Sequence, residues 1–323
     1  MPLVSAPPAR DFWTAQMDPR NQTPISFMPR RIDRAKNDMD SRRARFDLVL
    51  VGYRTADTQA ALRFCAKVFG TDLVRRRVLV LNRPDLTSEL DLDRSTWEIV
   101  LGTNTHGEFS GWQEGLARLG EPERGVIFMN DTVTTHRRFT HARAAALLGT
   151  LRSLDGPALV GFLDRGKGVY DYRIAGVRFD CWASTYCFAL SRSALGLLEN
   201  KLFEPDFVDR VVPGGLDEST FFSELSPDME RVLRFVLFEG GWYRAQRLTP
   251  ENTAQLRLKG RCIVAELFLS ARCSQIGIDL RDPFSTYRLY RRLDNVRRHA
   301  RRALGNFKRL ARASSALRLG NTL

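Results

Sequence analysis

Five apolar runs, each about the length of one buried strand, lie along the first half of the chain. They occupy residues 46–54, 76–84, 95–104, 125–132 and 157–164. Between them, residues 57–69, 109–119 and 139–151 place apolar side chains at helical spacing. Near-continuous apolar strands that alternate with helices are typical of a parallel sheet covered on both faces. The sequence therefore predicts an α/β fold with a mostly parallel, Rossmann-like sheet flanked by helices.

The pattern changes after about residue 174. Residues 174–192 alternate polar and apolar side chains and then become apolar throughout, which indicates a strand that leaves the core of the sheet. Residues 191–203 and 229–242 have the spacing of amphipathic helices. We divide the chain into an arm (1–45), a main domain (46–250), a helical extension (251–284) and a terminal helix (285–323).

Composition narrows the class of protein. Residues 1–45 are rich in Pro, Arg, Asp and Asn without a sustained period, which favours disorder. No run approaches the roughly 20 apolar residues that span a bilayer, and the first residues lack the pattern of a secretory signal. The five cysteines are widely spaced and form no CxxC or Cys/His cluster, which argues against structural zinc. We expect a reducing compartment, the cytosol or the cytosolic face of a membrane.

Basic charge is concentrated at the end of the chain. Between Arg281 and Arg318 there are twelve Lys/Arg and two Asp/Glu, a net charge of +10 out of +13 for the whole chain. The nearly neutral body argues against a nucleic-acid-binding core. The tail carries one apolar stripe: Leu289, Leu293, Val296, Ala300, Ala303, Phe307, Leu310 and Leu317.

This stripe predicts a basic amphipathic helix that lies on an anionic membrane surface through residues 285–318. The heptad spacing of the stripe leaves a coiled coil open. An acidic protein or nucleic acid as partner, and packing of the helix on the body, also stay open. The scarcity of aromatic residues in the helix counts against nucleic acid, and we expect no nucleic-acid partner.

Polar residues stand where the apolar runs end. They are Arg54, Asn82, Asp85, Asn104, Asn130 and Asp131. Asn and Asp are common turn residues because their side chains bond the nearby backbone. The other interpretation is a ligand site, because the carboxyl ends of parallel strands meet at the edge of the sheet where ligands bind.

Four segments, in this order, resemble a family-2-type glycosyltransferase with the GT-A fold, of the kind that makes bacterial cell-surface polysaccharide. They are the opening strand–helix–strand (46–85), GEFSGWQEGL (107–116), FMNDT (128–132), and GLDESTFF with DMERVLR (215–234). Gln113 stands where the family usually has Asn, and Asn130 stands at the first acid of the family's acidic "DxD" motif. The resemblance covers roughly residues 46–245 and ends on Gly241-Trp242.

The resemblance implies a donor site for a nucleoside-diphosphate-sugar. It assigns nucleoside contacts to Arg54, Asn82, Asp85 and Asn104, and further substrate contacts to Gly107, Gln113 and Asn130. Asp131 becomes the ligand of a divalent cation, Mn²⁺ or Mg²⁺, that neutralises the diphosphate. Asn130 weakens this expectation because an amide brings no charge. The basic residues at 136–138 are a second source of positive charge.

The resemblance also implies an acceptor site. Asp217 or Glu218 would be the base that takes the proton of the acceptor hydroxyl, with Asp228 and Glu230 as second candidates and inversion at the anomeric carbon. Asp217 could instead only cap the helix that follows it. Trp182 would stack on a sugar ring, or would be a core residue.

The sequence therefore predicts an enzyme, a peripheral membrane glycosyltransferase on the cytosolic face of the inner membrane, with a glycan or glycolipid as acceptor. A first alternative is a catalytically degenerate GT-A domain that acts as a scaffold or binding module, which Asn130 keeps open. A second is a nucleic-acid-binding protein that uses the Arg-rich tail.

Overall fold

The structure is a computed structural model. It describes residues 45–135, 139–166, 171–239 and 247–286, together with Leu289, Arg292 and Val296. The predicted arm up to residue 44, the basic residues at 136–138, Gly241-Trp242 and nearly all of the predicted terminal helix lie outside the described residues.

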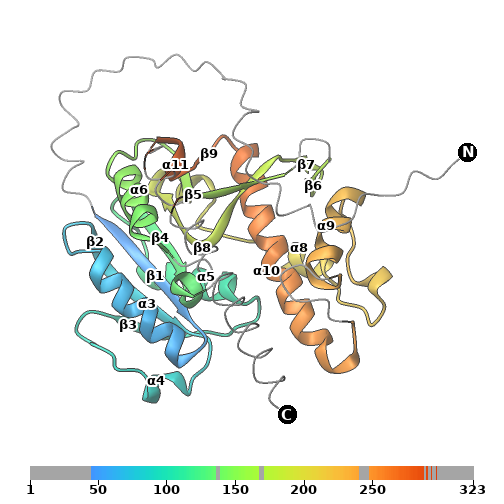
Figure 1. Ribbon diagram of the computed structural model, residues 1–323, viewed down its shortest axis with the longest axis horizontal. Helices are drawn as coiled ribbons and strands as arrows, with labels where there is room; N and C mark the ends of the chain where they lie inside the picture. Colours follow the sequence, from blue (N-terminus) through green and yellow to red (C-terminus); the bar gives the residue numbers. More distant parts are fainter. Residues whose placement is uncertain are drawn as a thin grey trace, which may run out of the picture.

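A seven-stranded sheet forms the centre of the molecule (Figure 1). Its strands are β1 (Phe46–Gly52), β2 (Val74–Leu81), β3 (Glu98–Leu101), β4 (Gly125–Asn130), β5 (Ala158–Arg165), β8 (Cys181–Ser191) and β9 (Asp279–Arg281). Their order across the sheet is β3-β2-β1-β4-β8-β5-β9. All neighbouring pairs are parallel except the two that β8 makes, with β4 and with β5.

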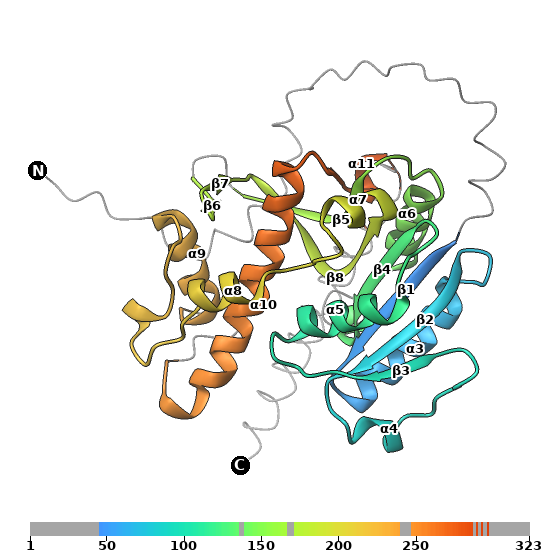
Figure 2. The same ribbon diagram turned by 180° about the vertical axis from the view of Figure 1, so that it is seen from behind.

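Helices cover both faces of the sheet (Figures 1 and 2). One face packs against α3 (Thr55–Val68), α6 (His141–Arg152) and α11 (Pro283–Thr286). The other packs against α5 (Glu108–Leu119), α7 (Arg192–Leu197) and α10 (Pro250–Gln275), and α8 (Pro205–Val211) packs on α10, where Phe207 stacks on Phe268. The predicted fold class, a mostly parallel α/β sheet flanked by helices, is confirmed. The helices predicted at 57–69, 109–119 and 139–151 correspond to α3, α5 and α6, within two residues at each end.

The strand predicted to leave the sheet core does the opposite. Residues 181–191 form β8, which lies between β4 and β5 and runs antiparallel to both. Every residue of β8 after Cys181 is buried, because a central strand of a sheet covered on both faces has a hydrophobic core on each side. The alternating residues before it form a small hairpin, β6 (Arg173–Ile174) and β7 (Val177–Arg178). The prediction was therefore wrong for 181–191.

Glycines let helix α5 lie close to the sheet. A Cβ at Gly115 would stand 2.4 Å from Cγ1 of Val49 on β1, and one at Gly111 would stand 2.9 Å from Cγ2 of Val51. Gly111 and Gly115 are four residues apart, so they share one helix face. The glycine spacing of GEFSGWQEGL therefore has a packing cause at these two positions.

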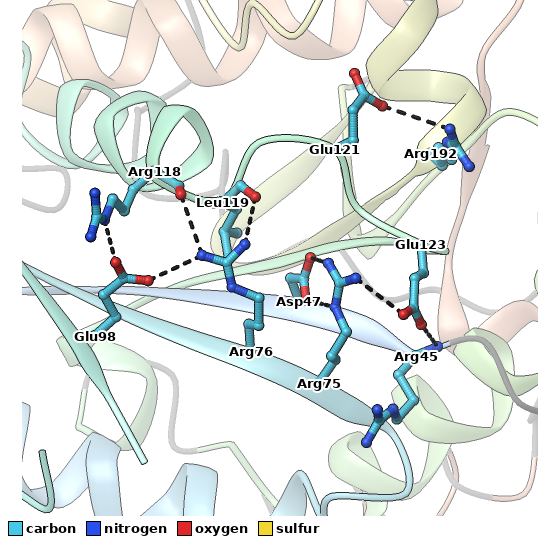
Figure 3. A network of polar contacts seen from close by, with 10 residues as sticks. All are labelled: Arg45, Asp47, Arg75, Arg76, Glu98, Arg118, Leu119, Glu121, Glu123 and Arg192. Atoms are coloured by element: carbon cyan, nitrogen blue, oxygen red, sulfur yellow. Dashed lines mark hydrogen bonds and ion pairs between the residues drawn. The ribbon is translucent and has the colours of Figure 1, made fainter. Parts of the chain in front are cut away.

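Ion pairs link β1, β2 and β3 at the end of the sheet where β1 begins (Figure 3). Arg75 on β2 donates two hydrogen bonds to the buried carboxylate of Asp47, at 3.0 and 2.7 Å. Arg75 also contacts Glu123, which accepts from the backbone of Arg45. Arg76 and Arg118 converge on Glu98. These pairs join the strands at the edge opposite to their carboxyl ends.

Four further elements complete the described fold. They are α4 (Leu86–Glu89), η1 (Asp131–Thr134), η2 (Glu218–Thr220) and α9 (Pro227–Leu237). In both views α10 lies between the sheet and the segment that holds α8 and α9. The helix predicted at 191–203 ends already at Leu197, because Glu199 and Asn200 have left-handed φ angles of 52° and 56°. In the described part of the chain no helix is both long and apolar enough to cross a bilayer.

Candidate functional site at the carboxyl ends of the strands

Asp131 directly follows β4 and holds the loop that follows β1. Its Oδ2 accepts from the backbone N–H of Tyr53 at 2.6 Å, the backbone N–H of Arg54 at 3.0 Å and the hydroxyl of Thr58 at 3.1 Å. The residue is only 1% exposed. The structure therefore brings two predicted site residues together, Arg54 and Asp131, at the carboxyl edge of two adjacent parallel strands.

Burial raises the pKa of the Asp131 carboxyl, and the three hydrogen bonds act against this rise. Asp57, in the first turn of α3, adds a further small upward effect on that pKa. These three bonds all go to Oδ2, the same one of the two carboxylate oxygens of Asp131. Arg54 itself is exposed beside this carboxylate.

Asn130 takes part in a turn. Its side-chain oxygen accepts from the hydroxyl of Thr132 at 2.8 Å, and the residue is half-buried. This is local turn chemistry of the kind that Asn and Thr favour after a strand. A cation that bound the Asn130 oxygen would share it with the hydroxyl of Thr132.

The residues present can hold a divalent cation only in part. Within the described ranges, no three His, Cys, Asp or Glu side chains are grouped closely enough to bind a metal ion. Oδ1 of Asp131 would therefore be a lone carboxylate ligand, with phosphate oxygens and water completing the shell. Mg²⁺ is often bound in this way, by one or two carboxylates and the phosphates of the substrate.

Asn82 joins the ends of β1 and β2 to the segment before α5. Its Nδ2 lies 2.8 Å from the Tyr53 hydroxyl, 3.3 Å from Oδ1 of Asn104 and 3.1 Å from the carbonyl oxygen of Gly107. Its Oδ1 is buried without a hydrogen-bond partner and packs against Gly102 and Gly111. The predicted residues Asn82, Asn104 and Gly107 are therefore neighbours, but Asn82 is 5% exposed and acts as a clamp.

Gly107 is shaped by the approach of α10. Its φ is 60°, and a Cβ there would stand 2.4 Å from Sγ of Cys262. Cys262 in turn donates to Oε2 of Glu108 at 3.2 Å. The backbone of Gly107 is thus held between Asn82 on one side and α10 on the other.

Tyr53 is a residue of this edge that sequence reasoning missed. Tyr53 is half-buried, and burial raises the pKa of its hydroxyl well above the ordinary value, with Glu108 as the next cause. Its position directly after the end of β1 at Gly52 could have indicated a site residue, but an aromatic residue at a strand end is equally typical of the hydrophobic core.

Two other predicted residues stand apart from Asp131. Asp85 is exposed and pairs with Arg83, which lowers the pKa of its carboxyl. Gln113 uses its whole amide to hold the backbone after α7, donating to the carbonyl of Asn200 at 2.8 Å and accepting from Leu202 at 2.9 Å. Gln113 therefore fastens α5 to that segment.

Asp217 and Glu218 lie on the far side of α10. The segment that carries them packs on Arg257 and Gly260, through Gly214 and Phe221. Gly107 packs on Leu258 and Cys262, which lie roughly opposite on a helix of 100° per residue. The body of α10 therefore separates the predicted base from the ends of β1 and β2.

Asp217 also caps the helix that follows it, which was the alternative role predicted for it. Its Oδ1 accepts from the backbone N–H of Ser219 at 2.9 Å, so it caps η2. This bond lowers the pKa of the Asp217 carboxyl. Both Asp217 and Glu218 are exposed.

Trp182 is a buried residue of β8. It is 6% exposed and meets the rings of Tyr172 and Phe179 edge to face. It lines a small apolar hollow with Met229 of α9 and Ile263 of α10. The packing therefore favours a core role for Trp182 over stacking on a sugar ring.

Comparison with known proteins adds little to this geometry. No protein-family model matches the chain, and no curated protein matches it in sequence. Among solved structures, one similar chain is the 4-diphosphocytidyl-2C-methyl-D-erythritol synthase of Anaerococcus prevotii DSM 20548. The two share 13% identity with a TM-score of 0.35, over 70% of this chain and 99% of that one.

Proposed function

We propose that this protein binds a nucleoside-diphosphate-sugar at the carboxyl edge of β1, β2 and β4 and transfers the sugar to an acceptor hydroxyl. The observation that carries the proposal is the position of Asp131. Its carboxylate accepts hydrogen bonds from the backbone N–H groups of Tyr53 and Arg54, at the start of α3. In dinucleotide-binding α/β folds, those groups receive the phosphates directly.

A diphosphate at this edge therefore meets a negative charge and needs a cation beside it. Oδ1 of Asp131 would be the protein ligand of Mn²⁺ or Mg²⁺. When bound, the cation would neutralise the diphosphate as it leaves with the bonding electron pair. The exposed guanidinium of Arg54 lies at the same loop and would add positive charge.

The nucleoside would lie over the ends of β2 and β3. Asn104 stands there with a left-handed φ of 55° and its side-chain oxygen oriented by Asn82. Asp85 follows β2 and is exposed. These groups offer the hydrogen bonds that a base and a ribose need, with Asn82 positioning Asn104 from below.

We propose a glycan or glycolipid acceptor at the cytosolic face of the inner membrane, which the basic tail would contact. The apolar stripe supports a docking role at its two described members, since Leu289 is 66% exposed and Val296 is 67% exposed. Sedimentation with vesicles of anionic or neutral phospholipid tests this. Deletion of residues 287–323 is expected to abolish binding to anionic vesicles, and unchanged binding would remove the membrane from the proposal.

Calorimetric titration tests the donor site. The four nucleoside diphosphates UDP, GDP, CDP and dTDP are titrated with and without Mn²⁺ into wild type, Asp131→Asn and, as matched control, Asp206→Asn on the exposed side of α8. We expect one nucleotide to bind wild type and the control in the presence of Mn²⁺, and Asp131→Asn to lose this binding while it stays folded. Absence of binding by wild type to every nucleotide would overturn the proposal.

A binding module without turnover is the second candidate. Asn130 favours it, because an amide at this position leaves a single carboxylate, Asp131, at the end of β4, and the amide oxygen already accepts from Thr132. Nucleotide-sugar binding without release of nucleoside diphosphate would support this candidate over the enzyme.

A further inference from the structure

We infer that Asp164, at the end of β5, is the carboxylate that takes the proton of the acceptor hydroxyl. The inference rests on the proposed glycosyl transfer and names a residue for it that the sequence did not indicate. The sheet topology places the ends of β4 and β5 at one edge.

Strands β4 and β5 both pair with β8 in antiparallel fashion, so they are parallel to each other. Phe188 of β8 is level both with Phe128 on β4 and with Gly161 on β5. Asp131 and Asp164 each lie three residues further along the chain, Asp131 just after β4 and Asp164 near the end of β5, so both lie at the same edge of the sheet. One strand separates them, which corresponds to about 10 Å between their backbones.

The two carboxylates also lie on the same face of the sheet. Ile127 and Met129 belong to the core on the α3 and α6 side, and Asp131 lies on that side as well because it accepts from the hydroxyl of Thr58 on α3. Val160 and Phe162 belong to the same core, so Asp164 follows them on β5. The carboxyl edge therefore presents one acid from each of two parallel strands to the same space.

Asp164 is oriented and remains within reach of solvent. The hydroxyl of Ser184 on β8 donates to its Oδ2, and the residue is half-buried. The part of β8 that follows Ser184 leaves the regular pairing with β5, and β8 lies against η1, the turn that carries Asp131. Thus β8 links the two acids through a short, ordered segment.

Asp217 and Glu218 fit the role less well. They are exposed beyond α10, and the capping bond of Ser219 lowers the pKa of Asp217, whereas a general base works best when its pKa is close to the working pH. They stay the sequence-based candidates and form the opposing arm of the test.

The acceptor oxygen forms its bond to the anomeric carbon while its O–H bond breaks and the proton passes to the Asp164 carboxylate. The bond between the anomeric carbon and the diphosphate oxygen breaks, and the nucleoside diphosphate leaves with the electron pair. Water can replace the acceptor in the same step, which makes donor hydrolysis a usable readout.

The experiment measures release of nucleoside diphosphate from a panel of UDP-, GDP-, CDP- and dTDP-linked hexoses, with water as acceptor. Wild type is compared with Asp164→Asn, Asp164→Ala and the double variant Asp217→Asn/Glu218→Gln. We expect Asp164→Asn to lower kcat by about 100-fold or more with little change in KM for the donor. Added formate is expected to restore part of the activity to Asp164→Ala, because it can replace the missing carboxylate.

Three results would overturn the inference. The first is wild-type kcat in Asp164→Asn together with a large loss in the double variant, which would return the role to Asp217 or Glu218. The second is loss of Mn²⁺-dependent nucleotide binding in Asp164→Asn, which would make Asp164 a metal ligand. The third is failure of wild type to release nucleotide from any donor, and this one removes the proposed function as well.

Ser184→Ala provides a variant that keeps the carboxylate. If Asp164→Asn does not fold, Ser184→Ala should still reduce kcat, by about tenfold, because Asp164 is then no longer held in one orientation. Asp164→Glu should recover part of the lost kcat. Unchanged kcat in Ser184→Ala with an unfolded Asp164→Asn would indicate a structural role only.

Discussion

The backbone N–H of Tyr53 donates to Oδ2 of Asp131 over 2.6 Å, so the residue that ends one strand holds the loop that leaves the next. Asp131→Ala removes the acceptor for this N–H, for that of Arg54 and for the hydroxyl of Thr58. We expect the free energy of unfolding in urea to fall by about 3 kcal/mol, because buried donors without partners are expensive.

Asp131→Asn separates the charge from the hydrogen bonds. Its amide oxygen can still accept in the place of Oδ2, so the loss of unfolding free energy should be no more than about 1 kcal/mol. Equal losses for Ala and Asn would show that the charge, and not the acceptor, stabilises the loop.

Gly107 and Gly120 form a matched pair. Their φ angles are 60° and 64°, but a Cβ at Gly107 would stand 2.4 Å from Sγ of Cys262, whereas one at Gly120 meets nothing within 4 Å. Both Ala substitutions should lower the melting temperature, because each places a Cβ on a backbone conformation that costs on the order of 1–3 kcal/mol in strain. Gly107→Ala should lower it further because of the contact with α10.

A double-mutant cycle isolates this contact. Cys262→Ala removes Sγ, so in that background Gly107→Ala should be no more destabilising than Gly120→Ala, as measured by thermal unfolding. Additive effects of Gly107→Ala and Cys262→Ala would place the cause of the destabilisation elsewhere.

The ion pairs at the opposite edge of the sheet should differ in strength. Arg75→Met leaves the carboxylate of Asp47, which is fully buried, without its two-pronged partner (Figure 3). We expect a loss of about 3 kcal/mol in unfolding free energy, because a buried charge without a partner is strongly destabilising.

Arg118→Met is the control for this prediction. Arg118 is 60% exposed where it meets Glu98, and pairs of that kind contribute about 0–1 kcal/mol. Urea unfolding of both variants checks the comparison, and a larger loss for Arg118→Met than for Arg75→Met would contradict it.

The cysteines should react in a set order with iodoacetamide. Burial raises the pKa of the Cys181 thiol to about 11 and of the Cys65 and Cys273 thiols to about 12. Cys181 is half-buried and the other four are buried, so peptide mapping of the native protein should find Cys181 alkylated first. Because the thiolate is the reactive form, its rate should rise about tenfold per pH unit between pH 7 and 9. Early alkylation of Cys262 would contradict the packing of α10 on Gly107.

The sequence predicted the first half of the fold well because its strands are continuous apolar runs and its helices have a regular period. Strands β1 to β5 and helices α3, α5 and α6 follow from these local patterns. The prediction was wrong at β8, whose apolar run was interpreted as a strand that leaves the sheet. Local pattern reports that such a segment is buried, but not where in the sheet it is inserted or in which direction it runs.

At the candidate site, the sequence by itself determined that polar residues stand at the ends of the strands, and parallel topology then requires Arg54, Asn82 and Asp131 to meet at one edge. Only the tertiary structure decided which of the predicted site residues already use their polar groups to hold the fold. The Asn82 amide donates to the carbonyl of Gly107, which is 25 positions away, and the Gln113 amide donates to the carbonyl of Asn200, which is 87 positions away. Helix α10 separates Asp217 from the edge, while β8 brings Asp164 to it. The physical reason is that a hydrogen bond or a packed helix links groups that are distant along the chain, and no local pattern records such a link.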